Sequence, residues 1–219
     1  MPRYDACLLD SDGVLVEPPA RETQVEACRA AFRAVGVADA ADEDVAALAS
    51  GVTVERLHEV AARYDLDPDA LWHARERHDE RSQLNAFRAG ERTAYDDVAV
   101  LAELPPNRGV VSNNHHSTVE FKLDFFGLRP LFDVAYGREM TVESLRLRKP
   151  NTHYLDRATA DLGGGSALYV GDSASDVVAA RRAGLDSAFV HRPHCRDVDL
   201  PVEPTHEVDT LHDVAALVD

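Results

Sequence analysis

Short apolar runs alternate with longer amphipathic stretches along most of the chain. Runs of about four apolar residues predict buried strands, and apolar residues spaced by three or four positions predict helices. The predicted strands cover residues 6–9, 108–112, 132–135, 167–170 and 187–190. The predicted helices cover residues 96–103, 118–126, 152–162 and 175–183, and a last one begins near Thr210. This alternation predicts a three-layer, Rossmann-like α/β fold with a mainly parallel sheet between helices.

One region departs from the alternation of strands and helices. Residues 21–87 are charged and alanine-rich, show helical spacing only, and are divided by glycine and proline into four predicted helices. An insertion of this length is large enough to pack as a small domain of its own. We therefore expect an α/β core domain formed by residues 1–17 and 91–219, and an all-helical cap domain formed by residues 18–90.

The chain is strongly acidic and poor in lysine. Of its 219 residues, 39 are Asp or Glu and 23 are Lys or Arg, which gives a formal net charge of -16. Only Lys122 and Lys149 are lysines. Because binding nucleic acid needs a positive surface, this composition argues against a DNA or RNA partner. An acidic surface stays hydrated when salt screens its self-repulsion, so we expect a halophilic protein.

The sequence also bears on compartment and redox state. It contains no apolar run of the roughly 18 residues that a membrane helix needs, and its N-terminus does not resemble a signal peptide. We therefore expect a cytoplasmic protein without a membrane partner, either a monomer or a homodimer. Cys7, Cys28 and Cys195 are widely separated, which predicts reduced thiols rather than disulfides.

Acidic pairs follow two of the predicted strands directly. Asp10 and Asp12 come after the first strand, and Asp172 and Asp176 come after the fourth. Because ligands of open parallel sheets bind beyond the carboxyl ends of the strands, the fold would bring four carboxylates to one edge. Hard oxygen ligands without a convergent His or Cys favour Mg²⁺. The sequence therefore predicts a magnesium site with these four residues as candidate ligands.

The order of these motifs resembles the haloacid dehalogenase-like superfamily. Its signature is DxDG with a following Thr or Val after strand one, a Ser or Thr after strand two, a Lys, and GDxxxD after strand four. The chain matches this signature at residues 10–14, at Ser112, at Lys149 and at residues 171–176. The resemblance spans roughly residues 4–190 of the core, and a helical cap in the first loop is similar as well.

The resemblance implies a nucleophile and a set of metal ligands. Asp10 would be the nucleophile and a ligand of Mg²⁺ through its side chain. The main-chain carbonyl of Asp12 and the carboxylate of Asp172 would be further ligands. Asp176 would bind the metal through water or orient Lys149, and an acid in the first turn of a helix is the alternative interpretation.

The resemblance also implies how a phosphoryl group would be held. Asp12 would protonate the leaving alkoxide and later take a proton from the attacking water. The Ser112 hydroxyl and the Asn113 amide would hold phosphoryl oxygens, and Lys149 would neutralise charge on the phosphate and on Asp10. For Ser112, capping of the next helix is the alternative interpretation.

The function implied by the resemblance is Mg²⁺-dependent hydrolysis of a small phosphate monoester through an aspartyl-phosphate, similar to the phosphoglycolate phosphatases. Haloacid dehalogenases lack an acid at the place of Asp12, which disfavours their chemistry. Sugar phosphomutases similar to β-phosphoglucomutase carry a His and an Arg where this chain has Glu22 and Val54, which disfavours the mutase. A catalytically silent binding module is a further alternative, and the complete set of motifs argues against it.

Other polar residues match no motif. Lys122 is expected to be solvated. Of His115 and His116, which follow the second strand, at most one is expected near the site. His191, His194 and Cys195 form a string that could suggest zinc, but no fourth ligand accompanies them.

Substrate selection is assigned to the predicted cap. The candidate selectors are the loop 50–53 between cap helices, Arg56 beyond it, and two arginines near the end of the insertion, Arg88 and Arg92. The sequence leaves the leaving group open between glycolate, a sugar and a nucleoside.

Overall fold

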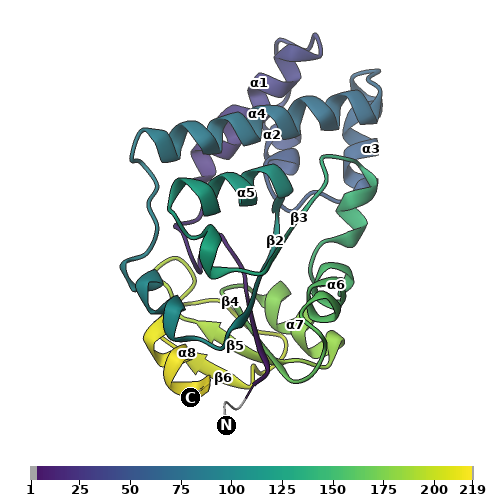
Figure 1. Ribbon diagram of the computed structural model, residues 1–219. Coiled ribbons are helices and arrows are strands. Elements are labelled where there is room, and N and C mark those ends of the chain that lie inside the picture. Colours follow the sequence, from purple (N-terminus) through teal and green to yellow (C-terminus); the bar gives the residue numbers. More distant parts are fainter. Residues whose placement is uncertain (1–3, 219) are drawn as a thin grey trace. The chain divides into compact units, whose positions relative to one another are not determined.

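The computed structural model describes residues 4–218 (Figure 1); the outermost residues of the predicted core domain, 1–3 and 219, lie outside that range. By its internal contacts the chain divides into two compact units. Unit 1 consists of residues 1–18, 93–137 and 147–219. Unit 2 consists of residues 19–92 and 138–146.

A six-stranded sheet forms the middle layer of unit 1. Its strands are β1 (Ala6–Leu9), β2 (Asn107–His115), β3 (Val134–Arg138), β4 (Ala167–Gly171), β5 (Asp186–Val190) and β6 (His206–Val208). The strand order is β3-β2-β1-β4-β5-β6, and β1 pairs in parallel with both β2 and β4. The predicted parallel sheet is therefore confirmed, with β1 at its centre.

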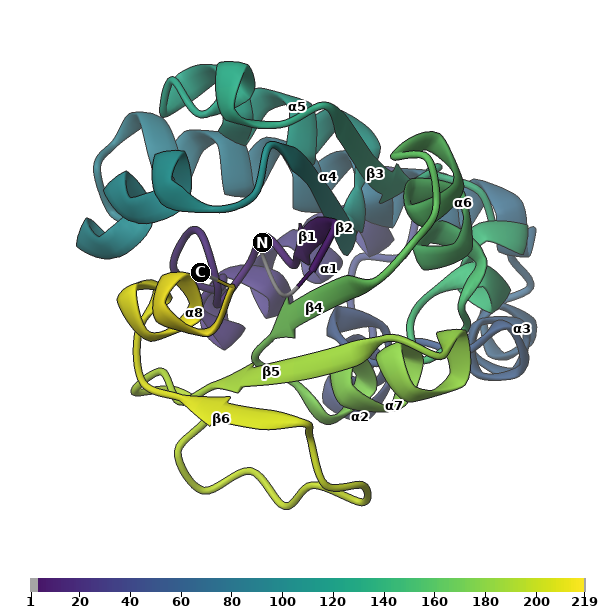
Figure 2. The same ribbon diagram turned by 60° about the horizontal axis from the view of Figure 1, so that its bottom comes forward.

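Helices cover both faces of this sheet. They are η1 (Asp96–Glu103), α5 (His116–Phe125), η2 (Arg129–Leu131), α6 (His153–Asp161), α7 (Ala174–Ala183) and α8 (Leu211–Val218). Figure 2 shows α6 and α7 on one side of the sheet and α8 on the other. Apolar residues of α6 and α7 pack with Leu8, Val111 and Tyr169 of the central strands, which buries one face of the sheet. The α/β class and its three layers are as predicted.

Two elements of unit 1 differ from the prediction. The strand β6 was not predicted, because its three residues contain only one buried apolar side chain, Val208. The segment 96–103, predicted as a helix, is a 3₁₀-helix. Its Asp97 carboxylate accepts hydrogen bonds from Arg192 and from the main-chain N–H of Leu211, so contacts distant in sequence hold this segment.

Unit 2 contains the four helices that the spacing predicted. They are α1 (Arg21–Ala34), α2 (Asp42–Ala49), α3 (Val54–Arg63) and α4 (Pro68–Arg88). The helix α4 begins with Pro68 in its first turn, as the proline predicted, and the Asp67 carboxylate caps it by accepting the main-chain N–H of Ala70. Phe32 and Trp72 are buried in a core to which all four helices contribute. Within the described residues, no helix has both the length and the apolarity required to cross a bilayer.

A short segment after β3 also belongs to unit 2, although the pattern assigned it to the α/β core. Residues 138–146 contain most of η3 (Glu143–Leu147). The Arg138 guanidinium forms a buried ion pair with Glu76 of α4, the Trp72 indole N–H donates to the carbonyl of Thr141, and Leu145 joins the helical core. These contacts explain why the segment packs with unit 2.

Candidate active site

The first acidic motif forms a turn at the carboxyl end of β1. Asp10 is 8% exposed, and its Oδ1 accepts the main-chain N–H of Ser11 at 2.7 Å. The chain then turns back on itself, because Leu15 and Val16 donate main-chain hydrogen bonds to the carbonyl of Ser11. The apolar strand thus ends in a tight turn that fixes Asp10 at the edge of the sheet.

Lys149 brings a buried positive charge to Asp10. Its side chain is almost fully buried, and its Nζ lies 3.1 Å from Oδ2 of Asp10 and 2.8 Å from Oδ1 of Asp176. The same ammonium donates to the Tyr169 hydroxyl at 2.6 Å and to the Val111 carbonyl at 3.0 Å. Four oxygen contacts, from the end of β1, from within β2 and β4, and from α7, therefore fix the lysine beside Asp10.

Asn113 holds the main chain of Lys149. Its side-chain Oδ1 accepts the Lys149 N–H at 2.8 Å, and its Nδ2 donates to the Lys149 carbonyl at 3.1 Å. The preceding residue of β2, Ser112, is buried, and its hydroxyl accepts the main-chain N–H of Asn114. The Asn113 carboxamide therefore positions the lysine segment, and a contact of Ser112 or Asn113 with phosphate stays a prediction.

The second acidic motif lies at the carboxyl end of β4. Carboxylate oxygens of Asp10, Asp172 and Asp176 lie within 4.8 Å of one another. Asp176 is buried in the first turn of α7, where its Oδ2 accepts the main-chain N–H and the hydroxyl of Ser173. Its Oδ1 accepts from Lys149. Asp176 therefore both caps α7 and orients Lys149. The two interpretations of Asp176, as an acid in the first turn of a helix and as a residue that orients Lys149, each describe part of its contacts.

Asp12 lies two residues after Asp10, with its side chain 18% exposed. Its Oδ2 accepts the Asn114 Nδ2 at 2.6 Å and the Lys122 Nζ at 2.9 Å. Lys122 is 1% exposed. The expectation that Lys122 is solvated was wrong, because the helical spacing of α5 places this residue on the buried side of the helix, where it forms an ion pair with Asp12.

The acidic cluster changes the proton affinity of its members. Burial raises the pKa of Asp10 to about 7; Lys149 opposes this shift, and the nearby carboxylates add to it. Burial also raises the pKa of Asp172, against a hydrogen bond from His194 that lowers it. For Lys149 burial disfavours the charged form, but Asp10 and Asp176 outweigh it and raise its pKa. The single Lys149 ammonium therefore does not balance the negative charge of the three carboxylates in this cluster.

This donor set fits a magnesium ion. Asp10 and Asp172 offer carboxylate oxygens at the ends of neighbouring strands, and with Asp176 they outnumber the single Lys149 ammonium beside them. Mg²⁺ prefers such oxygen ligands. In Asp176 both oxygens already accept hydrogen bonds from Lys149 and Ser173. Both oxygens of Asp10 are engaged in the same way, by Ser11 and Lys149, so these contacts do not separate the candidate ligands, and a direct metal bond to Asp176 stays a prediction.

The histidine string after β5 divides between two places. The ring of His191 bonds to Glu207 of β6, whereas His194 Nε2 lies 2.6 Å from Oδ2 of Asp172. Potential ligand atoms of Asp172, His194 and Cys195 also lie within 4.8 Å of one another. Cys195 Sγ bonds to main-chain carbonyls of residues 190 and 192. His191, His194 and Cys195 thus do not form one site, since the His191 ring pairs with Glu207 instead.

The remaining candidates lie in different surroundings. His115 is fully buried and contacts the Thr118 hydroxyl through Nδ1, and His116 Nδ1 accepts the main-chain N–H of Gly137. In unit 2, Thr53 caps α3, the Arg56 side chain pairs with Glu59, and Arg92 is buried over the ring of Phe87. Selection of substrate by these unit 2 residues stays a prediction.

Three residues of the site belong to none of the motifs found in the sequence. Lys122, Asn114 and Tyr169 lie within hydrogen-bonding distance of Asp12 or Lys149. The scarcity of lysine is a signal that could have singled out Lys122, because only two lysines occur in the chain. Tyr169 looks like any aromatic residue of a buried strand, so its hydroxyl contacts had no signal in the sequence.

Gly13 leaves the space that Asp172 occupies. Its φ is +84°, and a Cβ at this position would lie 2.0 Å from Oδ2 of Asp172. We expect Gly13→Ala to displace Asp172 and to weaken Mg²⁺ binding by about tenfold or more. Gly184→Ala is the matched control, since Gly184 has a φ of +72° with no atom within 4 Å of an added Cβ. Isothermal titration with Mg²⁺ measures the difference, and equal affinities of the two variants would contradict the expectation.

The fold and this group of side chains define a class of protein: a Rossmann-like α/β enzyme whose acidic centre lies at the carboxyl ends of its central strands. A model of the haloacid dehalogenase-like hydrolase family matches residues 4–184. The chain therefore belongs to the haloacid dehalogenase-like hydrolases. This confirms the resemblance seen in the motifs and the prediction of an enzyme.

Solved structures with the same fold cover nearly the whole chain. CbbY from Rhodobacter sphaeroides, in complex with phosphate, is 22% identical with a TM-score of 0.72 over 96% of each chain. A putative phosphoglycolate phosphatase from Lactobacillus plantarum is 17% identical with a TM-score of 0.69, over 98% of this chain and 99% of that chain. A predicted phosphatase from Clostridium acetobutylicum is 17% identical with a TM-score of 0.65 over 97% of each chain. Among curated proteins, none matches the chain in sequence.

Proposed function

We propose that the protein is a Mg²⁺-dependent phosphatase that hydrolyses a small phosphate monoester through an aspartyl-phosphate on Asp10. The observation that carries the proposal is the buried Asp10 carboxylate with the Lys149 ammonium 3.1 Å away and the Asp172 carboxylate beside it. An anionic nucleophile can approach a phosphate dianion only where cations reduce their repulsion. A buried lysine next to a metal-binding cluster meets this requirement.

In the first step Asp10 attacks phosphorus with a carboxylate oxygen. The new bond joins Asp10 to phosphorus, and the bond from phosphorus to the ester oxygen breaks. Asp12 gives its proton to that oxygen, so the alcohol leaves neutral. Lys149 stabilises the charge on the phosphoryl oxygens, and Ser112 and Asn113 at the end of β2 are the candidate hydrogen-bond donors to them.

In the second step a water molecule attacks the phosphorus of the aspartyl-phosphate. Asp12 takes the proton of this water, the bond between Asp10 and phosphorus breaks, and inorganic phosphate leaves. Asp10 and Asp12 return to their initial states, so the cycle consumes one ester and one water. The 2.9 Å contact with Lys122 and the 2.6 Å contact with Asn114 support this role by fixing Asp12 two residues from the nucleophile.

For the metal we propose Asp10, Asp172 and the main-chain carbonyl of Asp12 as ligands. Asp176 orients Lys149, because its Oδ1 accepts from that ammonium. A bound Mg²⁺ supplies positive charge that offsets the phosphoryl oxygens and the nucleophile. The pKa of Asp10, raised to about 7 by burial, would then fall, which keeps the nucleophile ionised.

We propose that residues 18–90 act as a cap domain that excludes water from the reacting group, and that the leaving group is small for that reason. The solved CbbY structures hold phosphate in one case and xylulose-1,5-bisphosphate in another. Sugar phosphates therefore belong in a substrate panel beside phosphoglycolate. The acidic composition further supports the proposal that the protein functions in a salt-rich cytoplasm.

The first test is hydrolysis of p-nitrophenyl phosphate in molar KCl. We expect turnover with Mg²⁺ and loss of at least about 100-fold after removal of the metal with EDTA, because one lysine does not balance the acidic cluster. Restored activity on re-adding Mg²⁺ is the control for reversible loss. Equal rates with and without metal would contradict the role of Mg²⁺.

A panel of phosphate esters then tests the substrate class. Phosphoglycolate, sugar monophosphates, a sugar bisphosphate and nucleoside monophosphates differ in size and charge beyond the shared phosphate. We expect a preference for small esters, measured as kcat/KM from released phosphate. Uniformly poor hydrolysis of the whole panel, with p-nitrophenyl phosphate included, would contradict the phosphatase assignment.

A further inference from the structure

The buried lysine of α5 has no counterpart among the motifs that identify the family in this chain. Lys122 is 1% exposed, and its Nζ lies 2.9 Å from Oδ2 of Asp12. Withdrawing an ammonium from water is costly unless a carboxylate and hydrogen bonds compensate for it. In a protein with only two lysines, both are buried, and both lie against aspartates of the same turn.

The Asp12 side chain is contacted from two different structural elements. Lys122 of α5 and the Nδ2 of Asn114 in β2 both donate to the same carboxylate oxygen, at 2.9 Å and 2.6 Å. Two donors on one oxygen restrict both the rotamer and the plane of a carboxylate. The side chain of Asp12 is therefore fixed in orientation, although it stands in a turn and is partly exposed.

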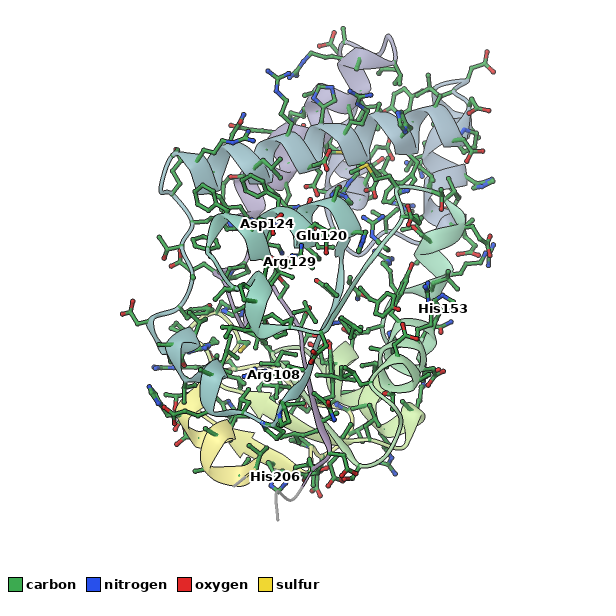
Figure 3. All side chains as sticks on the ribbon, viewed as in Figure 1. Arg108, Glu120, Asp124, Arg129, His153 and His206 are labelled. Carbon is green, nitrogen blue, oxygen red and sulfur yellow. The ribbon has the colours of Figure 1, made fainter. Side chains whose placement is uncertain are left out.

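The sequence of α5 forces Lys122 inward. Thr118, Val119, Lys122 and Leu123 are the buried residues of this helix and recur at helical spacing. The more exposed side carries Glu120 and Asp124, both of which pair with Arg129 of η2; Figure 3 labels these three residues. This outer ion pair gives a control, because it lies on the same helix but contacts no residue of the proposed mechanism.

We propose that Lys122 is a positioning residue for the proton transfers of Asp12 in the phosphatase reaction. It holds the carboxylate with Asn114, and its charge stabilises the negative charge that Asp12 gains as its proton passes to the leaving oxygen. The inference rests on the proposed function, since Asp12 has this task only in an ester hydrolysis of that kind. Lys122 itself gives up no proton and touches no reacting atom.

If Lys122 has this role, the loss of activity on replacing it should depend on the leaving group of the substrate. An alkyl phosphate releases a basic alkoxide that needs a proton from Asp12, whereas p-nitrophenolate leaves without one. A variant that loosens Asp12 should therefore lose more activity on the alkyl ester. The constant kcat/KM reports steps up to formation of the aspartyl-phosphate, so it isolates the proton transfer to the leaving group from the later attack of water.

The experiment compares Lys122→Met, Asn114→Ala and Glu120→Gln with the wild type. Each is assayed with p-nitrophenyl phosphate and with an alkyl phosphate that the wild type hydrolyses. For Lys122→Met we expect kcat/KM to fall by about 100-fold on the alkyl ester and by less than about tenfold on the aryl ester. Asn114→Ala should show the same imbalance, and Glu120→Gln should leave both constants within about twofold of the wild type.

Each result of this experiment either supports or contradicts the positioning role of Lys122. Equal losses of Lys122→Met on the two esters, or no loss on either, would overturn the positioning role. If Lys122→Met does not fold, as judged by thermal unfolding, Asn114→Ala carries the test, and equal losses there would overturn the proposal as well. A wild type that hydrolyses neither ester would instead contradict the proposed function, which the assay of the wild type alone reveals.

Discussion

Asp10→Asn is expected to lower phosphatase kcat by on the order of 10⁴-fold or more, because a carboxamide cannot form the aspartyl-phosphate. The variant is nearly the same size as the native residue and keeps an oxygen that can accept the Ser11 N–H. It also removes one carboxylate from a cluster in which burial and neighbouring acids already raise the pKa of Asp10 to about 7. We therefore expect the fold to be retained.

The measurement is phosphate release under saturating Mg²⁺ and substrate, with thermal unfolding of each protein as the check on folding. Asp124→Asn on α5 is the matched control, since the Asp124 side chain is 67% exposed and pairs with Arg129. It should keep wild-type activity. An Asp10→Asn protein that is folded and hydrolyses substrate within tenfold of the wild type would exclude Asp10 as the nucleophile.

Lys149→Met is expected to impair both stability and catalysis. The Lys149 ammonium forms ion pairs with the buried carboxylates of Asp10 and Asp176. Removing one partner of a buried ion pair leaves an uncompensated charge, which costs about 3–5 kcal/mol of unfolding free energy. We also expect kcat to fall by about 1,000-fold, since the charge on the phosphoryl group and the nucleophile loses its fixed counterpart.

Urea unfolding of the metal-free protein measures the stability, and phosphate release measures the rate. Lys149→Arg is the control that keeps the charge. Because a planar guanidinium cannot reproduce the contacts of Nζ with Tyr169 and the Val111 carbonyl, this variant should recover more stability than activity. A Lys149→Met protein as stable as the wild type would contradict the structural role of the lysine.

The sequence predicted the strands of the core well where local pattern decides them. β1 and β4 are short apolar runs that end in acidic motifs, and both appear within one residue of their predicted bounds. The helices of unit 2 were also predicted, because helical spacing and the breaking residues glycine and proline are local signals. β6 escaped prediction, since its pairing with β5 depends on neighbours rather than on an apolar run of its own.

For the site, the motifs predicted which residues gather at the edge of the sheet. Asp10, Asp172, Asp176 and Lys149 come together as the order of the strands requires. The sequence could not decide what Asn113 does, because its carboxamide binds the main chain of a residue 36 positions away. Such long-range hydrogen bonds have no periodicity and leave no trace in a single sequence.

The sequence by itself determined the α/β class, the helical insertion and the family, because each depends on periodicity or on a motif of fixed local spacing. Only the tertiary structure decided the partners of side chains that meet from distant segments. It paired Lys122 with Asp12 across 110 positions, brought the Tyr169 hydroxyl to Lys149, and packed residues 138–146 with the helices of unit 2. The physical reason is that a buried charge or hydroxyl takes its nearest partner in space, and folding sets that partner through strand order and helix packing rather than through local sequence.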